Sequence, residues 1–229
     1  MRIQELAGKH KGSDIYIVGT GPSMRVFPVD FLKDKITLGL NQAWRYGKLT
    51  YSITVHPELV LDYLKEPKHS TTWIIKKKPP MENLELSDPT HYVFHTEQEN
   101  YEILTKPKPD ILFIGRGVQQ TAMHMAAIMG AKNIILVGVD MTDLGGEHHG
   151  HDQHVKFHGM APSDVYAEYR KVTAKVRSTL LRKGINTLTL TPFLGAVHGN
   201  EDYARLLHEM NLPKLPTPKD TSTYTRKGS

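Results

Sequence analysis

The stretch Gly117-Val-Gln-Gln-Thr-Ala-Met-His-Met-Ala-Ala-Ile-Met-Gly130, followed by Ala131-Lys132 and Asn133-Ile-Ile-Leu-Val-Gly-Val-Asp140, decides the fold class. Its first part has apolar residues at helical spacing and closes on a glycine, which is typical of the end of a helix. Its second part is almost continuously apolar, as strands buried on both faces of a parallel sheet are. The stretch therefore predicts a helix over 117–130 that leads directly into a central parallel strand.

The same alternation of strand and helix extends in both directions along the chain. Helical spacing predicts further helices over 57–65, 163–183 and 200–210. Short β-rich runs predict further strands over 14–18, 36–40, 51–55, 71–75, 91–95, 110–114 and 185–190. This order predicts an α/β fold, a single Rossmann-like doubly wound, mainly parallel sheet with helices on both faces. In such sheets ligands gather at the carboxyl ends of the strands.

Composition sets the class of protein before any motif is read. The chain has 229 residues, 39% of them hydrophobic and 23% charged, and it contains no cysteine. It has no apolar run long enough to cross a bilayer, and residues 1–14 lack the apolar core of a secretory signal, so we expect a cytoplasmic protein without a membrane span. The absence of cysteine excludes disulfides, thiolate zinc sites and cysteine nucleophiles.

The formal charge of +5 suggests a polyanion-binding protein. However, +3 of that charge falls in residues 213–229, on Lys214, Lys219, Arg226 and Lys227 against Asp220. This segment is rich in proline and threonine and has no apolar period, which predicts a basic, disordered tail. We therefore expect one catalytic, nucleotide-binding domain over 1–212 and a tail over 213–229.

A glycine-rich turn, Gly19-Thr20-Gly21-Pro22-Ser23, follows the first predicted strand. Glycines allow a phosphate to approach the backbone closely, Ser23 offers a hydroxyl, and proline suits the first position of a helix. Met24 and Arg25 stand where the dinucleotide-binding fingerprint has further glycine, so that fingerprint is incomplete. A nucleotide site and an ordinary tight turn both explain the pattern.

Polar residues also follow the next two predicted strands. Asn41 and Gln42 come after 36–40, and His56 comes after 51–55. Side-chain amides donate and accept hydrogen bonds at once, so they can read a base or a ribose, but Asn41 is equally suited to cap a helix. Since the carboxyl ends of parallel strands share one edge, we expect these groups to lie near the glycine-rich turn.

The turn Gly115-Arg116-Gly117 repeats the arrangement of strand, glycine and helix. Arg116 is suited to neutralise a phosphate there, although an exposed loop arginine explains it as well. Asp140 ends the central strand, where an aspartate binds a ribose or an acceptor hydroxyl, or caps a turn. Lys76-Lys77-Lys78 is a basic run at a strand end, which is usually a solvated edge but can hold a polyanion together with the tail.

The segment 145–159 is rich in glycine and histidine, and its histidines are His148, His149, His151, His154 and His158. Long loops of this kind after a buried strand are often active-site lids, and histidine serves as a general base near neutral pH. The HExxH motif and an Asp-x-Asp pair are both missing. The sequence therefore favours a lid with one catalytic histidine over a specific metal site.

Three of these stretches together resemble one superfamily. They are Ile-Val-Gly-Thr-Gly-Pro-Ser, then Leu-Gly-Leu-Asn-Gln, then the helix–strand unit that ends at Asp140. The resemblance covers about residues 14–192. It is to the Rossmann-like superfamily of Campylobacter-type bacterial sialyltransferases, motility-accessory-factor sugar transferases and MptE-like 6-hydroxymethylpterin diphosphokinases.

The resemblance implies a nucleotide donor, of the UDP- or CMP-sugar type, held by Gly19, Gly21, Ser23, Asn41 and Gln42. The Gly115–Gly117 turn and Asp140 then flank the donor or the acceptor. The sialyltransferases have asparagine where this chain has Thr20, and they use a histidine after the Asp-ending strand as general base. His154 and His158 are the candidates for that base here.

The leading hypothesis is therefore a glycosyltransferase that moves a sugar from a nucleotide-sugar to an acceptor hydroxyl. The acceptor is a glycan, a small molecule or a hydroxymethylated base in DNA. One alternative is an ATP-dependent diphosphokinase acting on a pterin-like alcohol, which needs Mg²⁺ held by Asp140, Asp143 or similar groups. Another alternative is a nucleotide- or DNA-binding module without turnover.

Overall fold

A single sheet organises the computed structural model, which describes residues 1–65, 70–77, 91–141, 162–190, 208–209 and 211–212. Its order is β6-β5-β4-β3-β2-β1-β7-β8, and every strand pair is parallel. The strands are β1 Asp14–Val18, β2 Ile36–Leu40, β3 Tyr51–Thr54, β4 Thr72–Lys76, β5 His91–Gln98, β6 Ile111–Ile114, β7 Asn133–Val137 and β8 Asn186–Thr189. The predicted strands and the α/β class are confirmed, and the described sheet is wholly parallel.

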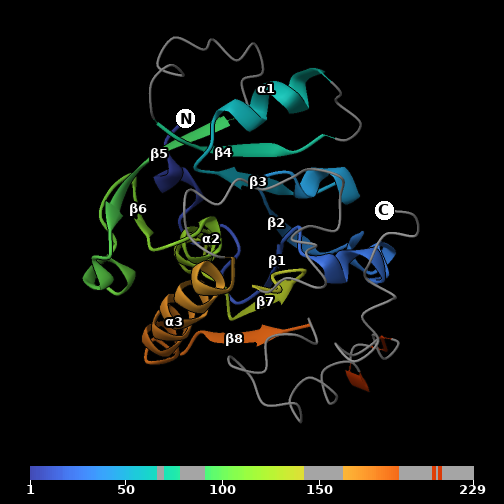
Figure 1. Ribbon diagram of the computed structural model, residues 1–229. Helices are drawn as coiled ribbons and strands as arrows, with labels where there is room; N and C mark the ends of the chain where they lie inside the picture. Colours follow the sequence, from blue (N-terminus) through green and yellow to red (C-terminus); the bar gives the residue numbers. More distant parts are fainter. Residues whose placement is uncertain (66–69, 78–90, 142–161, 191–207, 210, 213–229) are drawn as a thin grey trace.

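The direction of winding reverses between β1 and β7. The chain begins in the middle of the sheet at β1, adds β2 to β6 on one side, and then returns to place β7 and β8 on the other side of β1 (Figure 1). Neighbouring connections leave opposite faces of the sheet at such a point, so the carboxyl ends of the two strands border a crevice. The topology therefore places a natural ligand site beyond the ends of β1 and β7.

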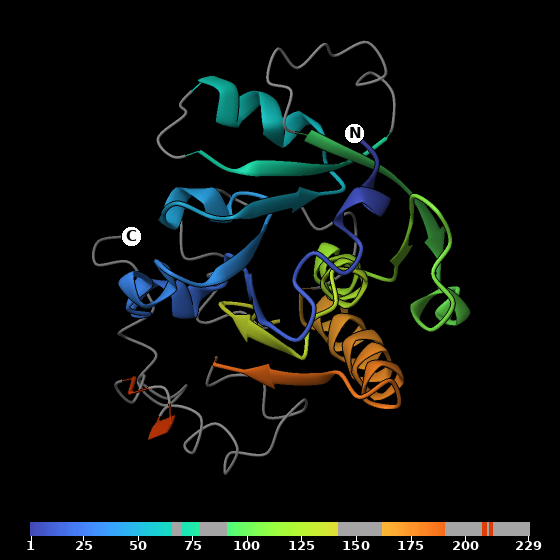
Figure 2. The ribbon, with the colours of Figure 1, turned by 180° about the vertical axis from the view of Figure 1, so that it is seen from behind.

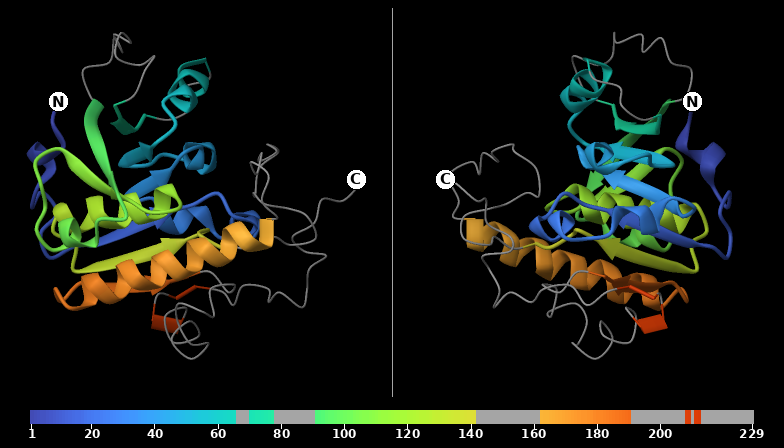
Figure 3. Two further views of the ribbon diagram at one scale, coloured as in Figure 1. Left: turned by 60° about the vertical axis from the view of Figure 1, so that its left-hand side comes forward. Right: turned by 90° about the vertical axis from the view of Figure 1, so that its right-hand side faces the viewer.

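One face of the sheet is covered by α2 (Val118–Ile128) and α3 (Pro162–Leu181). Ile15 and Ile17 of β1 point toward this face, and the residues of α2 from Val118 to Ala126 are all buried. A helix that is buried on every side lies inside a protein, and α2 packs against both the sheet and α3, which itself also contacts β8. Both views of Figure 3 show α3 lying along the sheet, and Figure 2 shows the 3₁₀ turn η1 (Ile3–Leu6) beside β5.

The opposite face is covered by α1 (Glu58–Lys65) and by short 3₁₀ turns. Tyr16 and Val18 of β1 point toward it, as the two-residue alternation of a strand requires. The turns that pack here are η2 (Pro22–Arg25), η3 (Val29–Leu32) and η4 (Ala43–Tyr46). Helices on both faces are therefore confirmed, with 3₁₀ turns doing much of the covering on this side.

The helix expected after the glycine-rich turn is the single 3₁₀ turn η2, with Pro22 at its first position as expected. It cannot lengthen far, because Pro28 lacks an N–H and disfavours helical geometry at Phe27 before it. The predicted helices over 57–65, 117–130 and 163–183 correspond to α1, α2 and α3. The helix predicted over 200–210 and the tail over 213–229 lie outside the described residues, apart from 208–209.

Candidate functional site

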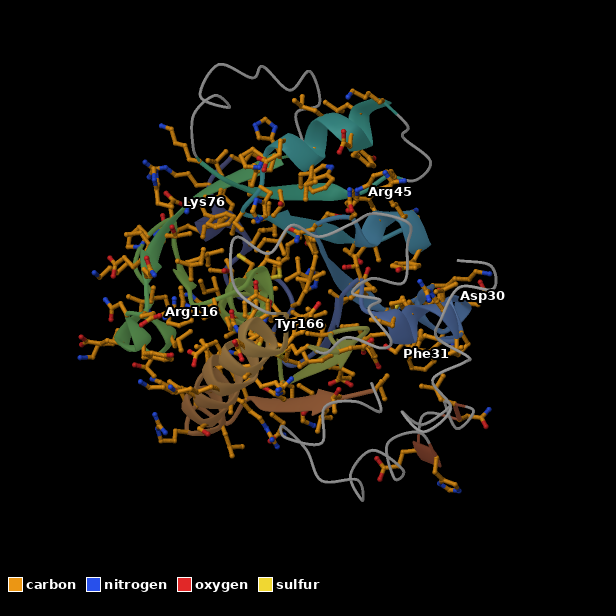
Figure 4. The ribbon with its side chains drawn as sticks, in the orientation of Figure 1. Asp30, Phe31, Arg45, Lys76, Arg116 and Tyr166 are labelled. Carbon is orange, nitrogen blue, oxygen red and sulfur yellow. The ribbon has the colours of Figure 1, made fainter. Side chains whose placement is uncertain are left out.

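A cavity of about 500 Å³ opens at the carboxyl edge of the sheet, on the face covered by α2 and α3. The turns after β1, β2, β3, β6 and β7 line it, together with the end of β4 and the first turns of α3. Figure 4 labels three lining residues that come from separate elements, Lys76 of β4, Arg116 before α2 and Tyr166 of α3. The predicted site residues that line the cavity are Gly19, Thr20, Gly21, Asn41, Arg116, Gly117 and Asp140.

The two glycines of the first turn allow two loops to cross at the β1–β7 junction. The N–H of Gly19 donates to the carbonyl of Val137 at 2.7 Å, and that of Gly21 donates to the carbonyl of Gly138 at 2.8 Å. A Cβ on Gly19 would collide with the Gly138 carbonyl, and one on Gly21 would lie 2.5 Å from Oδ2 of Asp140. The close approach of the two loops thus explains both glycines, while the same turn also lines the cavity.

Ser23 and Asp140 join these two loops by a pair of short hydrogen bonds. The backbone N–H of Ser23 donates to Oδ2 at 2.7 Å, and its hydroxyl donates to Oδ1 at 2.6 Å. Both residues are 1% exposed. Burial and the nearby Asp140 carboxylate raise the pKa of Tyr46, although Arg25 acts in the opposite sense. The carboxylate therefore caps the η2 turn, the second of the roles expected for it, and a ligand-binding role for Ser23 or Asp140 stays a prediction.

The ends of β2 and β3 are joined through Asn41. This residue has a positive φ of 51°, its N–H donates to the carbonyl of Ile53, and its Oδ1 accepts from the hydroxyl of Thr54 at 3.0 Å. Asn41 does not cap a helix, because the residue that precedes η4 is Gln42, whose side chain makes no capping hydrogen bond. That alternative is wrong. Asn41 instead turns the chain at the cavity wall, whereas Gln42 is buried.

The β3–β6 side of the cavity carries cationic groups. Lys76 is the last residue of β4, is partly exposed and lines the cavity, so this lysine of the basic run lies at the cavity wall. Arg116 is about half exposed, and its Nη2 lies 3.4 Å from Oε1 of Glu99. His56 also lines the cavity, with Nδ1 3.3 Å from Oε1 of Glu58. A ligand entering here meets two permanent cations and an imidazole.

Gln120 fixes the start of α2 at the cavity floor. Its Oε1 accepts from the N–H of Gly117 at 2.8 Å, which is half of a capping box. Its Nε2 donates to the hydroxyl of Thr173 at 2.9 Å and to the carbonyl of Tyr169 at 3.3 Å. Gly115 leaves room for this arrangement, since a Cβ there would lie 2.5 Å from Val172 of α3. The sequence signal was a glutamine three residues after Gly117.

Three of the polar side chains that line the cavity, Gln119, Tyr166 and Tyr169, were not expected from the sequence to belong to a site. Tyr166 and Tyr169 are one turn apart on α3, so both face the cavity, and burial raises the pKa of Tyr169. Gln119 lies in the first turn of α2 and is 5% exposed. The helical spacing of the tyrosines was visible in the sequence. Only the packing of α3 against α2 shows that they reach the carboxyl edge.

The histidine-rich segment lies outside the described residues, and with it the candidate bases His154 and His158. Among the residues that the structure describes, no three side chains of histidine, aspartate or glutamate are grouped as a metal site requires. No helix in the described part of the chain is both long and apolar enough to cross a membrane.

No protein-family model matches the chain, and no curated protein matches it. Similar solved structures include the sialyltransferase CstII from Campylobacter jejuni with the substrate analogue CMP-3FNeuAc, at 14% identity, covering 80% of this chain and 84% of that chain, with a TM-score of 0.47. The sialyltransferase CST-II with a trisaccharide acceptor and CMP is 15% identical, with 82% and 85% covered and a TM-score of 0.49. These values describe a distant likeness of fold. Membership of any group named by the sequence resemblance stays a prediction.

Proposed function

We propose that this protein is a glycosyltransferase that uses a nucleotide-sugar donor of the CMP or UDP type. One observation carries the proposal, namely the cavity at the carboxyl edge beside the point where the sheet reverses direction. It is large enough for a nucleotide, since small-molecule sites usually measure about 300–1,000 Å³. The resemblance read from the sequence motifs supports the same class of ligand.

The proposed donor lies with its nucleoside toward the turns after β1 and β2. Gly19, Thr20 and Gly21 line the cavity there without bulky side chains, and Asn41 offers a side-chain amide. The phosphate lies toward Arg116 and the N-terminus of α2, where a guanidinium and the first-turn N–H groups favour negative charge. In this orientation the nucleoside contacts the uncharged turns after β1 and β2, and the phosphate contacts the cationic side of the cavity.

The proposed reaction is a displacement with inversion at the anomeric carbon. The acceptor oxygen forms a bond to that carbon, the bond to the phosphate oxygen breaks, and the nucleotide leaves with the electron pair. A histidine, His154 or His158, takes the proton of the acceptor hydroxyl. Arg116 and the α2 terminus stabilise the charge on the departing phosphate.

Ligand screening tests this proposal directly. We expect CMP or UDP to raise the melting temperature of the full chain, and we expect ATP with Mg²⁺ to raise it less. Calorimetric titration then gives the affinity, and hydrolysis of the nucleotide-sugar in the absence of acceptor reports the chemistry. Tight binding of ATP with strict dependence on Mg²⁺ would indicate the diphosphokinase instead, and the absence of any nucleotide binding would rule out both.

The acceptor class is a separate part of the proposal. A glycan, a small molecule and a hydroxymethylated base in DNA are all compatible with a cavity that opens to solvent. If DNA is the acceptor, deletion of residues 213–229 should weaken DNA binding and reduce its dependence on salt concentration, because the basic groups of the tail are lost. Unchanged DNA affinity in the deleted protein would exclude the tail as a tether.

A further inference from the structure

Two adjacent glutamines at the start of α2 have opposite hydrogen-bonding states. Gln120 is fully buried, and both ends of its side-chain amide are used, by Gly117 on one side and by α3 on the other. Gln119 is 5% exposed, and its Nε2 is buried without a hydrogen-bond partner. A buried donor that lacks a partner is unfavourable, because it has lost its hydrogen bond to water without gaining another. One of the two glutamines therefore stabilises the fold, and the other lowers its stability.

The surroundings of Gln119 indicate which kind of group its unpaired Nε2–H donor can bind. Its amide lies against the α-carbon of Gly117, where a Cβ would meet its Cδ and Nε2 at 2.9 Å. The residue lines the cavity next to Arg116. No hydrogen bond is recorded for the backbone N–H of Val118 or Gln119 among the described residues, as is usual in the first turn of a helix. Several donors and one cation thus meet at one end of α2.

We infer that Gln119 hydrogen-bonds an anionic oxygen of the ligand, of the phosphate type, that binds at the N-terminus of α2. The side chain has three rotatable bonds, so a small rotation in the cavity brings Nε2 to such an oxygen. Binding then supplies the partner that the free protein lacks. This inference rests on the proposed function for the identity of the ligand, but the contrast with Gln120 does not.

The need to cap α2 does not explain the amide of Gln119. Gln120 already caps the helix, so Gln119 is not needed for that purpose. Methionine has a similar volume and no polar atom to satisfy, and it would fill the same space without an unpaired donor. Selection for stability alone would therefore favour an apolar residue at position 119.

The test compares Q119M with its neighbour Q120M as the matched control. Thermal unfolding without ligand should show an unchanged or higher Tm for Q119M and a fall of about 4 °C or more for Q120M. Calorimetric titration with CMP, UDP and inorganic pyrophosphate should show about ten- to a hundredfold weaker binding to Q119M. The side-chain NH₂ signal of Gln119 in an NMR spectrum, assigned by its loss in Q119M, should shift when ligand is added.

A second variant tests the geometry without removing the amide. G117A has an ordinary extended backbone at that position, but its methyl group displaces the Gln119 side chain. We expect weaker binding of the same ligands with little change in Tm. G117A moves the amide of Gln119 and Q119M removes it, so together the two variants show whether binding depends on where the amide lies.

The outcomes separate the inference from the proposed function. Equal affinity of wild type and Q119M for every ligand overturns the inference and leaves the glycosyltransferase proposal standing. If wild type binds pyrophosphate but neither nucleotide, and Q119M loses that binding, the inference holds and the proposed donor is wrong. A marked loss of stability in Q119M, or no binding of any of the three by wild type, overturns the inference.

Discussion

The carboxyl edge of the sheet has two halves that differ in how their polar groups are satisfied. In the β1–β7 half, glycine loops cross closely, and both oxygens of Asp140 accept hydrogen bonds from Ser23. In the β4–β6 half, Lys76 and Arg116 border open space, and Gln119 has an unpaired donor. The first half holds the backbone in place, and the second half offers groups to a ligand. Changes in the first should affect folding, and changes in the second should affect binding.

The largest effect is expected for Asp140→Ala. The substitution removes the carboxylate that accepts from both the N–H and the hydroxyl of Ser23, a residue that is 1% exposed. We expect a loss of about 3–4 kcal/mol in the free energy of unfolding. Urea denaturation followed by circular dichroism measures it. Glu99→Ala, an exposed carboxylate of the other half, is the control and should change stability by less than about 0.5 kcal/mol.

If Asp140→Ala is as stable as the control, the β1–β7 half does not depend on this contact. Loss of nucleotide binding with retained stability would then assign Asp140 to the ligand instead, which is the first of the two roles expected from the sequence.

A pH-dependent effect is expected from His124, beneath the open half. Its Nδ1 accepts from the N–H of Phe113 at 2.9 Å, and burial lowers its pKa to about 4, although the nearby Ile103 backbone acts in the opposite sense. Because the folded protein disfavours the charged imidazole, the neutral form stabilises the fold fully above the unfolded pKa of about 6.5. We expect stability to fall by roughly 3 kcal/mol as the pH drops from 6.5 to 4.

The check is urea denaturation between pH 4 and 7.5 on wild type and His124→Asn. Asparagine keeps an acceptor for the Phe113 N–H but does not titrate, so the variant should lose most of this pH dependence. An equally steep decline in the variant would show that other groups cause it.

The next effect concerns ligand affinity. Lys76→Met and Arg116→Met each keep the apolar part of the side chain and remove one positive charge from the cavity wall. We expect each to weaken nucleotide binding about tenfold, and to change Tm by no more than about 2 °C, because both side chains are partly exposed. Lys77→Met, which removes an exposed charge one residue further along, is the control. Equal affinity for all the variants would mean that the anionic group does not bind on this side.

How far the sequence alone predicted the site differs between the halves. The strand segments and the α/β class followed from patterns with a direct physical cause, such as the apolar run over 133–139. The glycines at 19 and 21 indicated a tight turn, but only the structure shows that this turn crosses the loop after β7. Lys76 and Gln119 could not be assigned to the site, because lysine and glutamine are ordinary on exposed surfaces and helices. Only three-dimensional packing shows that one of them lines a cavity and that the other has a buried donor without a partner. Spacing indicated the capping hydrogen bond of Gln120, but it could not indicate that the neighbouring Gln119 has a buried donor without a partner.

The smallest effect is expected for Glu99→Gln, and its direction is informative. Glu99 lies 3.4 Å from Arg116 and competes with any anionic ligand for that guanidinium. Removing its charge should raise nucleotide affinity about two- to threefold, since exposed ion pairs are worth about 0.2–1 kcal/mol.

The control for net charge is Glu102→Gln, which removes an exposed carboxylate paired with Lys106. In both variants glutamine keeps the size of the side chain. Calorimetric titration with CMP at low and at physiological salt should show the gain shrinking as salt rises. A gain of the same size in both variants would indicate long-range attraction rather than release of Arg116, and a loss of affinity would mean that Glu99 orients the arginine for its ligand.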